Sequence, residues 1–168
     1  VTVKLVTNNS SYYDTMTIVK LSDIGELDIG SRNLLLATKG SKTIAGNNTT
    51  NQCTHLYSLY NSHQTGRDMN GRKVTLSFKY SVTSGATGSF RIQANGSYAS
   101  PQTGGKWSVL SNFINVESQP SGTIFYTTTI DNDTTKGFNG IQTRMDNFNG
   151  SLTIAECMLT YGNIQTGW

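Results

Sequence analysis

The chain has 168 residues and a formal net charge of +3, and charged residues make up only 14% of it. A chain of this length is expected to form one domain with its own core. Its 17 Gly and 8 Tyr against 2 Pro are typical of an all-β domain with many turns. The basic residues are scattered rather than clustered, which argues against a nucleic-acid partner. No apolar run approaches the length of a transmembrane helix and no signal peptide is recognisable, so we expect no membrane partner.

The chain begins in mid-pattern and without Met, as expected for a module of a longer protein. Residues 1–30 hold two short apolar runs separated by a polar stretch, and they carry little further pattern. We interpret residues 1–30 as a linker or N-terminal strand segment from a larger protein. Residues 31–168 are then the main domain.

The first part of this domain alternates short apolar segments with polar loops. Residues 34–36 are apolar and predict a short strand, and residues 39–51, rich in Gly, Asn and Thr, predict a loop. Residues 53–60 predict a strand, with Cys53, His55 and Tyr57 on one face. Both faces of this strand carry bulky side chains, so the pattern does not indicate which one is buried. Residues 61–71 predict a second polar loop.

Residues 72–93 carry the strongest strand signal in the chain. Apolar and polar side chains alternate strictly over 74–82, and the alternation resumes at 90–93 after a Gly-rich break. Phe90 and Ile92 then share one face, and Arg91 and Gln93 share the other. The two halves form either a hairpin or two successive strands on opposite sheets of a sandwich.

The remaining strands are predicted at 106–116, 123–130 and 141–145, and in the segment that begins at 152. Asn149 and Gly150 predict a hairpin turn. In the last segment the apolar positions change parity, and a β-bulge near Glu156 would keep all of them inward. Since no convincing amphipathic helix occurs, the sequence predicts an all-β fold, an antiparallel β-sandwich or jelly roll.

Neither metal chemistry nor catalysis has a motif. His55 and His63 lack partners at ligand spacing, and a turn explains the sequence 131–133 better than a Ca²⁺ site does. No nucleophile motif, phosphate loop or convincing carboxylate pair is found, so we predict a protein that is not an enzyme and that uses no cofactor. For Cys53 and Cys157 we favour free thiols over a disulfide.

The order of the motifs resembles a known family. The matching stretches are Ser31-Arg32-Asn33-Leu34-Leu35-Leu36, Gly71-Arg72-Lys73-Val74-Thr75-Leu76-Ser77-Phe78, Gly105-Lys106-Trp107, Met145-Asp146-Asn147-Phe148, Leu152-Thr153-Ile154, Leu159-Thr160-Tyr161-Gly162-Asn163 and Gln165-Thr166-Gly167-Trp168. Over residues 31–168 they resemble the jelly-roll carbohydrate-binding modules of tail and baseplate proteins, such as evolved distal tail and receptor-binding proteins, from phages of Gram-positive bacteria.

This resemblance implies non-catalytic binding of a host cell-wall polysaccharide, in aid of adhesion to the host. It implies a location in the phage tail of the virion, after assembly in the host cytoplasm, and other tail or baseplate proteins as partners. The alternative is a structural module that packs on other tail subunits without binding sugar.

A saccharide site needs aromatic rings that stack on the sugar and planar polar side chains that pair with its hydroxyls. The candidate ligand-binding residues are Arg91, Gln93, Arg144, Tyr98, Trp107, His55 and Tyr57. Gln142 and Arg144 alternate with apolar residues as Arg91 and Gln93 do, so the two strands together would form a groove. A solvated sheet face is the alternative for these polar pairs, and a place in the core or at a sheet edge is the alternative for Trp107.

Overall fold

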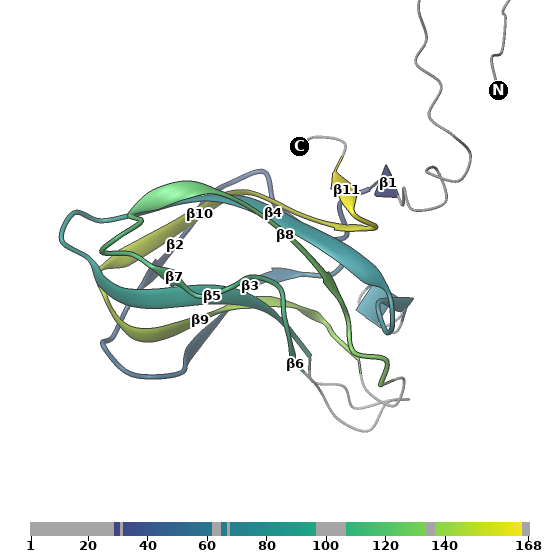
Figure 1. Cartoon of the computed structure of the whole chain (residues 1–168), viewed down its shortest axis with the longest axis horizontal. Helices are drawn as coiled ribbons and strands as arrows, with labels where there is room; N and C mark the ends of the chain where they lie inside the picture. Colours follow the sequence, from purple (N-terminus) through teal and green to yellow (C-terminus); the bar gives the residue numbers. More distant parts are fainter. Residues whose placement is uncertain are drawn as a thin grey trace, which may run out of the picture.

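The computed structural model describes residues 29–30, 32–61, 65–66, 68–96, 107–133 and 137–165. These residues form eleven β-strands, arranged as Figure 1 shows. The strands are β1 (Ile29–Gly30), β2 (Lys42–Ala45), β3 (Gln52–Ser58), β4 (Lys73–Val82), β5 (Thr87–Asn95), β6 (Trp107–Val109), β7 (Ile114–Asn115), β8 (Ser121–Thr129), β9 (Gly140–Asn149), β10 (Ser151–Tyr161) and β11 (Ile164–Gln165). Over the described ranges, no helix combines the length and the apolar character that a membrane span requires.

Two antiparallel sheets face each other across the core (Figure 1). The four-stranded sheet has the order β2-β10-β4-β8, and the five-stranded sheet has the order β3-β9-β5-β6, with β7 also paired to β5. If β6 and β7 count as one interrupted strand, this is the eight-stranded connectivity of a jelly roll. The predicted all-β sandwich is therefore confirmed. The predicted segment 1–30 is represented only by β1, which pairs in parallel with β11, because residues 1–28 lie outside the described residues.

Strands β4 and β5 supply the centre of the core, as their alternation predicts. Val74, Leu76 and Phe78 are at most 1% exposed, and Phe90 and Ile92 are fully buried. Of the two predicted arrangements, successive strands on opposite sheets is the observed one, since β4 and β5 belong to different sheets. The Phe90 side chain therefore faces β4 across the core, where its ring lies edge-on to Tyr80 with the ring centroids 5.1 Å apart.

The predicted bulge in β10 is also confirmed. The register with β4 shifts between Ala155 and Met158, and Glu156 has a φ of 48°. The Asn33 side chain anchors the strand beside the bulge, because its Nδ2 donates to the Cys157 carbonyl and its Oδ1 accepts from the Leu159 N–H. The Cys157 side chain is buried and Cys53 is exposed, and both thiols are free, as predicted.

The predicted strand at 34–36 is wrong. This segment makes a single bridge, between Leu35 and Leu59, and the Leu36 side chain is 44% exposed. The predicted loop 39–51 contains the edge strand β2, which pairs with β10. Only Ile44 of β2 is buried, so the sequence there shows no visible alternation of apolar and polar residues.

Two further predictions need correction. The single strand expected at 106–116 is broken into β6 and β7, because Ile92 of β5 donates its backbone N–H to the Ser111 hydroxyl between them. The turn at Asn149 and Gly150 does not close a hairpin, because β9 and β10 lie in different sheets. It is the crossover from one sheet to the other.

Candidate functional site

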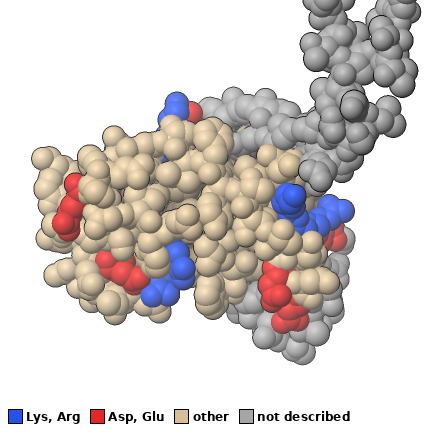
Figure 2. All heavy atoms as spheres, viewed as in Figure 1, with Lys and Arg blue, Asp and Glu red and all other residues tan. Residues whose placement is uncertain are grey.

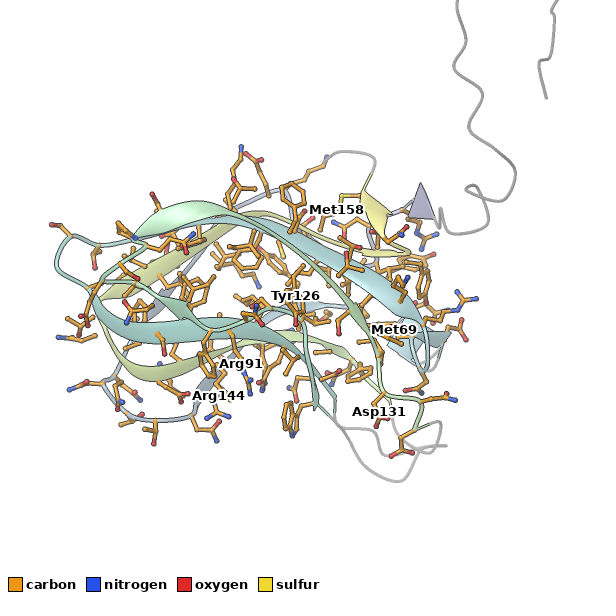
Figure 3. All side chains as sticks on the ribbon, in the orientation of Figure 1. Met69, Arg91, Tyr126, Asp131, Arg144 and Met158 are labelled. Carbon is orange, nitrogen blue, oxygen red and sulfur yellow. The ribbon has the colours of Figure 1, made fainter. Side chains whose placement is uncertain are left out.

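The outer face of the five-stranded sheet gathers most of the candidate residues. Arg91 of β5 lies directly opposite Arg144 of β9, and Gln93 lies opposite Gln142. On the other side of β9, Gln142 pairs with His55 of β3. In Figure 3 Arg91 and Arg144 project side by side from this sheet, away from the four-stranded sheet. The two strands with matching Arg and Gln alternation are thus neighbours in register.

Two aromatic side chains border the arginine pair. Trp107 of the edge strand β6 is 59% exposed, and Phe113, between β6 and β7, is 42% exposed. The Arg91 guanidinium carbon lies 4.6 Å from the Phe113 ring centroid and 5.5 Å from that of Trp107. The Arg144 guanidinium carbon lies 5.6 Å from the Phe113 centroid. We call Arg91, Arg144, Trp107 and Phe113 the Arg–aromatic cluster.

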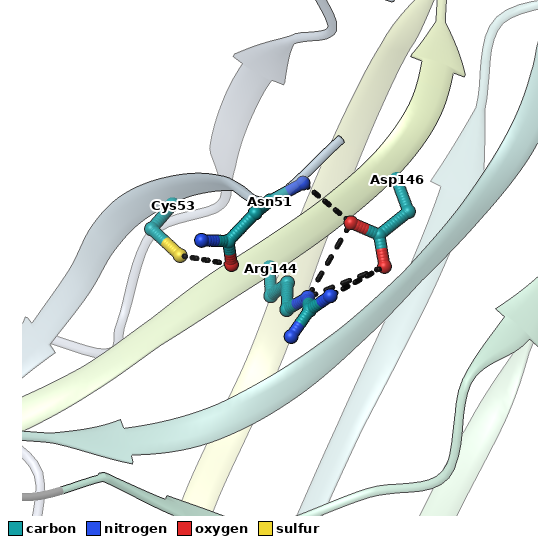
Figure 4. Close-up of polar contacts among 4 residues, drawn as sticks. All are labelled: Asn51, Cys53, Arg144 and Asp146. Carbon is teal, nitrogen blue, oxygen red and sulfur yellow. Dashed lines mark hydrogen bonds and ion pairs between the residues drawn. The ribbon is translucent and has the colours of Figure 1, made fainter. Parts of the chain in front are cut away.

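Arg144 has an anionic partner within the protein. Its Nε lies 3.2 Å from Asp146 Oδ2, and one terminal nitrogen lies at the same distance from that oxygen (Figure 4). The Asn51 backbone N–H also donates to the Asp146 carboxylate. Burial alone would raise the pKa of Asp146, but the hydrogen bonds from Asn51 and Arg144 outweigh it and hold that pKa below its ordinary value. Asp146 is therefore ionised at neutral pH and fixes the guanidinium of Arg144.

Arg91 is placed differently. Its Nε is buried and has no hydrogen-bond partner. Burial lowers the pKa of this guanidinium, and the neighbouring charge of Arg144 lowers it further. Arginine stays protonated in spite of such shifts. Arg91 thus carries a partly desolvated charge, held against two aromatic rings.

The glutamine pair lies beside the cluster and is unusually buried for the outer face of a sheet. Gln93 is 5% exposed and Gln142 is 9% exposed, and the Gln93 Oε1 is buried without a hydrogen-bond partner. His55 is next in the row and is mostly exposed. Partial burial of its ring, and after that the charge of Lys42, lower the pKa of His55. Its ring lies against Gly140, where an added Cβ would come within 2.6 Å of the His55 Cε1.

The structure thus brings together five of the seven predicted residues. Arg91, Gln93, Arg144, His55 and Trp107 all lie on this face. The interpretation of Trp107 as a core residue is wrong, and its alternative place at a sheet edge is the observed one, since β6 pairs only with β5.

Tyr57 does not belong to the face, and Tyr98 lies outside the described residues. The register of β3 shifts between His55 and Tyr57, which breaks the parity that predicted a common face for the two side chains. Tyr57 is only 2% exposed, and its hydroxyl donates to the Gly40 carbonyl.

Phe113 and Asp146 belong to the site but were not among the candidate residues. Phe113 has the same parity as Trp107 and Val109, but alternation alone does not show whether that face is inner or outer. The interruption between β6 and β7 has no clear signal in the sequence. Asp146 follows Gln142 and Arg144 at the same parity on β9, so continuing the alternation by one step would have identified it.

Beyond Arg91, Arg144 and Asp146, charge is sparse on this side of the molecule (Figure 2). In the view of Figure 2, basic and acidic atoms lie close together below β5 and β9, and most of the rest of the described surface is uncharged. Among the described residues, no group of three or more His, Cys, Asp or Glu side chains is arranged to hold a metal ion. The chemistry that the site offers is stacking on aromatic rings and hydrogen bonding to planar side chains.

Comparisons with known proteins identify no family for this chain. No family model matches it, and no curated protein does. A solved structure that resembles it is described as "CryoEM structure of Mud Crab Dicistrovirus", with 14% sequence identity over 94% of this chain and 93% of that one. The TM-score of 0.22 is too low to support any conclusion about fold or function.

Proposed function

We propose that the outer face of the five-stranded sheet is a non-catalytic saccharide-binding surface, and that the chain is a module of a phage tail or baseplate protein that adheres to the host cell wall. Two lines of reasoning support this proposal. The first is the resemblance of residues 31–168 to such modules. The second is the chemistry of the Arg–aromatic cluster, which is independent of that resemblance.

The exposure of Trp107 and Phe113 beside two arginines is the observation that carries the proposal. Exposed rings are suited to the C–H faces of a sugar, and guanidinium and amide groups are suited to its hydroxyls. Gln93 adds an amide oxygen that has no hydrogen-bond partner within the described part of the protein. A solvated sheet face would need neither exposed aromatic rings nor buried amides.

Binding without catalysis is consistent with the state of the carboxylate at the site. A glycosidase needs a protonated carboxylic acid near the scissile bond, and therefore a raised pKa. The pKa of Asp146 is instead lowered, and both of its hydrogen-bonding partners favour the charged form. Asp146 is thus suited to positioning Arg144, and it is poorly suited to donating a proton.

A fluorescent fusion of the whole chain to a carrier protein tests the proposal. We expect it to label Gram-positive cells and to bind their purified wall polysaccharide. A single shallow site should bind weakly, and several copies on one carrier should raise the apparent affinity by about 10²–10⁴. If neither cells nor polysaccharide are bound by a multivalent fusion, the proposal is wrong.

Trp107→Ala locates the binding surface. Loss of one stacking contact should weaken binding by about tenfold. Phe125→Ala is the matched control, because Phe125 is 69% exposed but lies on β8 of the four-stranded sheet. Equal effects of the two substitutions would show that the sugar does not bind at the Arg–aromatic cluster.

The same control residue supports a second candidate function, a structural module that packs on other tail subunits. Phe125 is the most exposed large apolar side chain of the described residues, and it lies opposite Ser77 on the outer face of the four-stranded sheet. Co-purification with neighbouring tail proteins that is lost in Phe125→Ser, together with no polysaccharide binding, would favour this function over the first.

A further inference from the structure

The charge balance of the candidate face indicates what kind of saccharide it can hold. Two guanidinium groups lie opposite each other in the register of β5 and β9, and both contact the same Phe113 ring. One carboxylate, that of Asp146, accompanies them and is hydrogen-bonded to Arg144. The cluster therefore has one positive charge more than it has negative charges.

The excess charge can be assigned to Arg91. The Arg91 Nε is buried without an acceptor, whereas the guanidinium of Arg144 is hydrogen-bonded to Asp146. Contacts with two aromatic rings stabilise a cation only in part. A guanidinium satisfies its planar set of donors best when it meets a carboxylate or a phosphate.

The surroundings of Arg91 also favour an anion over a neutral ligand. Arg91 lies beside Arg144 and both guanidinium groups contact Phe113, so burial first and the like charge of Arg144 second destabilise the charged form of Arg91 and lower its pKa. A ligand anion close to both guanidinium groups would reverse that repulsion, and a neutral hydroxyl would not. The adjacent Gln93 and Gln142 can hydrogen-bond the hydroxyls of the same ligand.

We infer that the ligand of this face is an acidic saccharide, whose carboxylate or phosphate is bound by Arg91 while a sugar ring stacks on Trp107 or Phe113. This inference rests on the proposed function and names the substrate class of the same site. The guanidinium of Arg144 is held in place by Asp146. Its positive charge beside Arg91 limits where the anion of the ligand can lie. A guanidinium recognises a carboxylate and a phosphate in the same way. Only an experiment can therefore tell whether the anion of the saccharide is a uronic acid or a phosphate.

The test uses an array of bacterial-wall oligosaccharides in matched pairs. Each uronic-acid member is paired with the same oligosaccharide in which the carboxyl group is reduced to an alcohol. Each glycosyl-phosphate member is paired with its dephosphorylated form. The probe is the whole chain on a multivalent carrier. We expect acidic members to bind about tenfold more tightly than their neutral partners, the effect of one charge-assisted hydrogen-bonded contact. Preference within the uronic-acid pairs or within the phosphate pairs identifies the anion.

Arg91→Gln is the decisive variant, since it removes the charge and keeps a planar hydrogen-bonding group. We expect it to lower the binding of acidic members to that of their neutral partners, so that the ratio of affinities within each pair falls to about one. Arg72→Gln is the matched control, because Arg72 also lies against an aromatic ring, that of Tyr161 at 4.7 Å, but lies outside the candidate face. It should leave the preference intact. Thermal melting of each variant confirms that it is folded.

The outcomes separate this inference from the proposed function. If no member binds, charged or neutral, the proposed function is wrong and the inference fails with it. If neutral members bind as tightly as acidic ones and Trp107→Ala weakens both, the proposed function holds and the acidic ligand is wrong. If the acidic preference survives in Arg91→Gln or is lost in Arg72→Gln, Arg91 is not the anion-binding residue.

Discussion

The outer faces of the two sheets cover the same core but differ in how far their polar atoms are satisfied within the protein. On the four-stranded sheet, short hydroxyl side chains pair across strands, as Thr75 and Thr127 do with oxygens 2.8 Å apart. One hydroxyl there, that of Thr160, is buried without a partner. On the five-stranded sheet, a guanidinium nitrogen of Arg91 and the amide oxygen of Gln93 are both unpaired, two positions apart on β5.

A β-sandwich does not require long planar side chains with unpaired atoms on an outer face. Either sheet needs only apolar side chains on its inner face and soluble ones on its outer face. Short Thr and Ser side chains meet the second need on the four-stranded sheet at little cost in side-chain entropy. Long planar side chains with unpaired atoms cost more in entropy and in desolvation. A ligand that binds these side chains is a physical reason for their presence.

The largest expected effect is a loss of stability in the core that both sheets share. Phe90→Ala in the shared core should lower the free energy of unfolding by about 3–5 kcal/mol, because it leaves a cavity where the ring contacts both sheets. The Phe90 ring is fully buried and its centroid lies 6.5 Å from that of Phe148 as well as close to Tyr80. Chemical denaturation measures the change. Phe125→Ala, the same substitution on the exposed side of β8, should change stability by less than about 0.5 kcal/mol.

The next effect belongs to the four-stranded sheet alone. Asn33→Ala should lower the free energy of unfolding by about 2–3 kcal/mol, because the carbonyl of Cys157 and the N–H of Leu159 both lose a partner beside the bulge. Polysaccharide binding at 25 °C should not change. A weaker affinity in a folded Asn33→Ala variant would show that the two faces are coupled and that their comparison as independent surfaces is wrong.

Much of this contrast can be predicted from the sequence, up to a definite limit. Alternation predicts that Arg91 and Gln93 share one face and that Gln142 and Arg144 share another, because side chains in a strand point to opposite sides in turn. Alternation does not predict that β5 and β9 are neighbours, since about 50 residues separate them and pairing partners depend on the whole topology. The juxtaposition that makes the cluster is therefore a result of the fold.

Trp107 shows a second limit. Its parity with apolar residues predicts a common face, but parity does not tell whether that face is inner or outer. An edge strand of only three residues, interrupted before β7, places the ring at the surface. The bulge in β10 was predictable for the opposite reason. Five apolar positions had to remain inward in one long strand, and only an extra residue allows that.

A smaller effect concerns the ion pair of the five-stranded face. Asp146→Asn should lower the free energy of unfolding at neutral pH by about 1–2 kcal/mol, because Arg144 loses its charged partner and the Asn51 N–H loses a charged acceptor. Affinity for acidic saccharides should rise in the same variant, since a competing carboxylate is removed. Titration calorimetry measures that second change, and a fall in affinity would show that fixing Arg144 contributes more to binding than the competing carboxylate takes away.

The pH dependence of this pair has a definite sign. The pKa of Asp146 is lower in the folded chain than in the unfolded chain, so its stabilisation is present above the unfolded pKa and is lost as the pH falls through the folded pKa. The stability difference between wild type and Asp146→Asn should therefore be constant near neutral pH and should shrink below about pH 4. A difference that grew on acidification would exclude the ionised form as the origin of the effect.

The smallest effect is expected for the same chemical change on the opposite face. Glu156 at the bulge pairs with Lys79, with 2.7 Å between the nearest charged atoms, but the two side chains are 41% and 54% exposed. Those of Asp146 and Arg144 are only 20% and 30% exposed. Water and salt screen the more exposed pair, so Glu156→Gln should cost no more than about 0.5 kcal/mol, and that cost should vanish at high ionic strength. The bulge at residue 156 should persist in this variant, since Gln is no less able than Glu to adopt its backbone conformation.

Denaturation of Asp146→Asn and Glu156→Gln under identical conditions compares the two faces directly. If Glu156→Gln costs as much as Asp146→Asn, the polar groups of the two faces do not differ in the way their burial indicates.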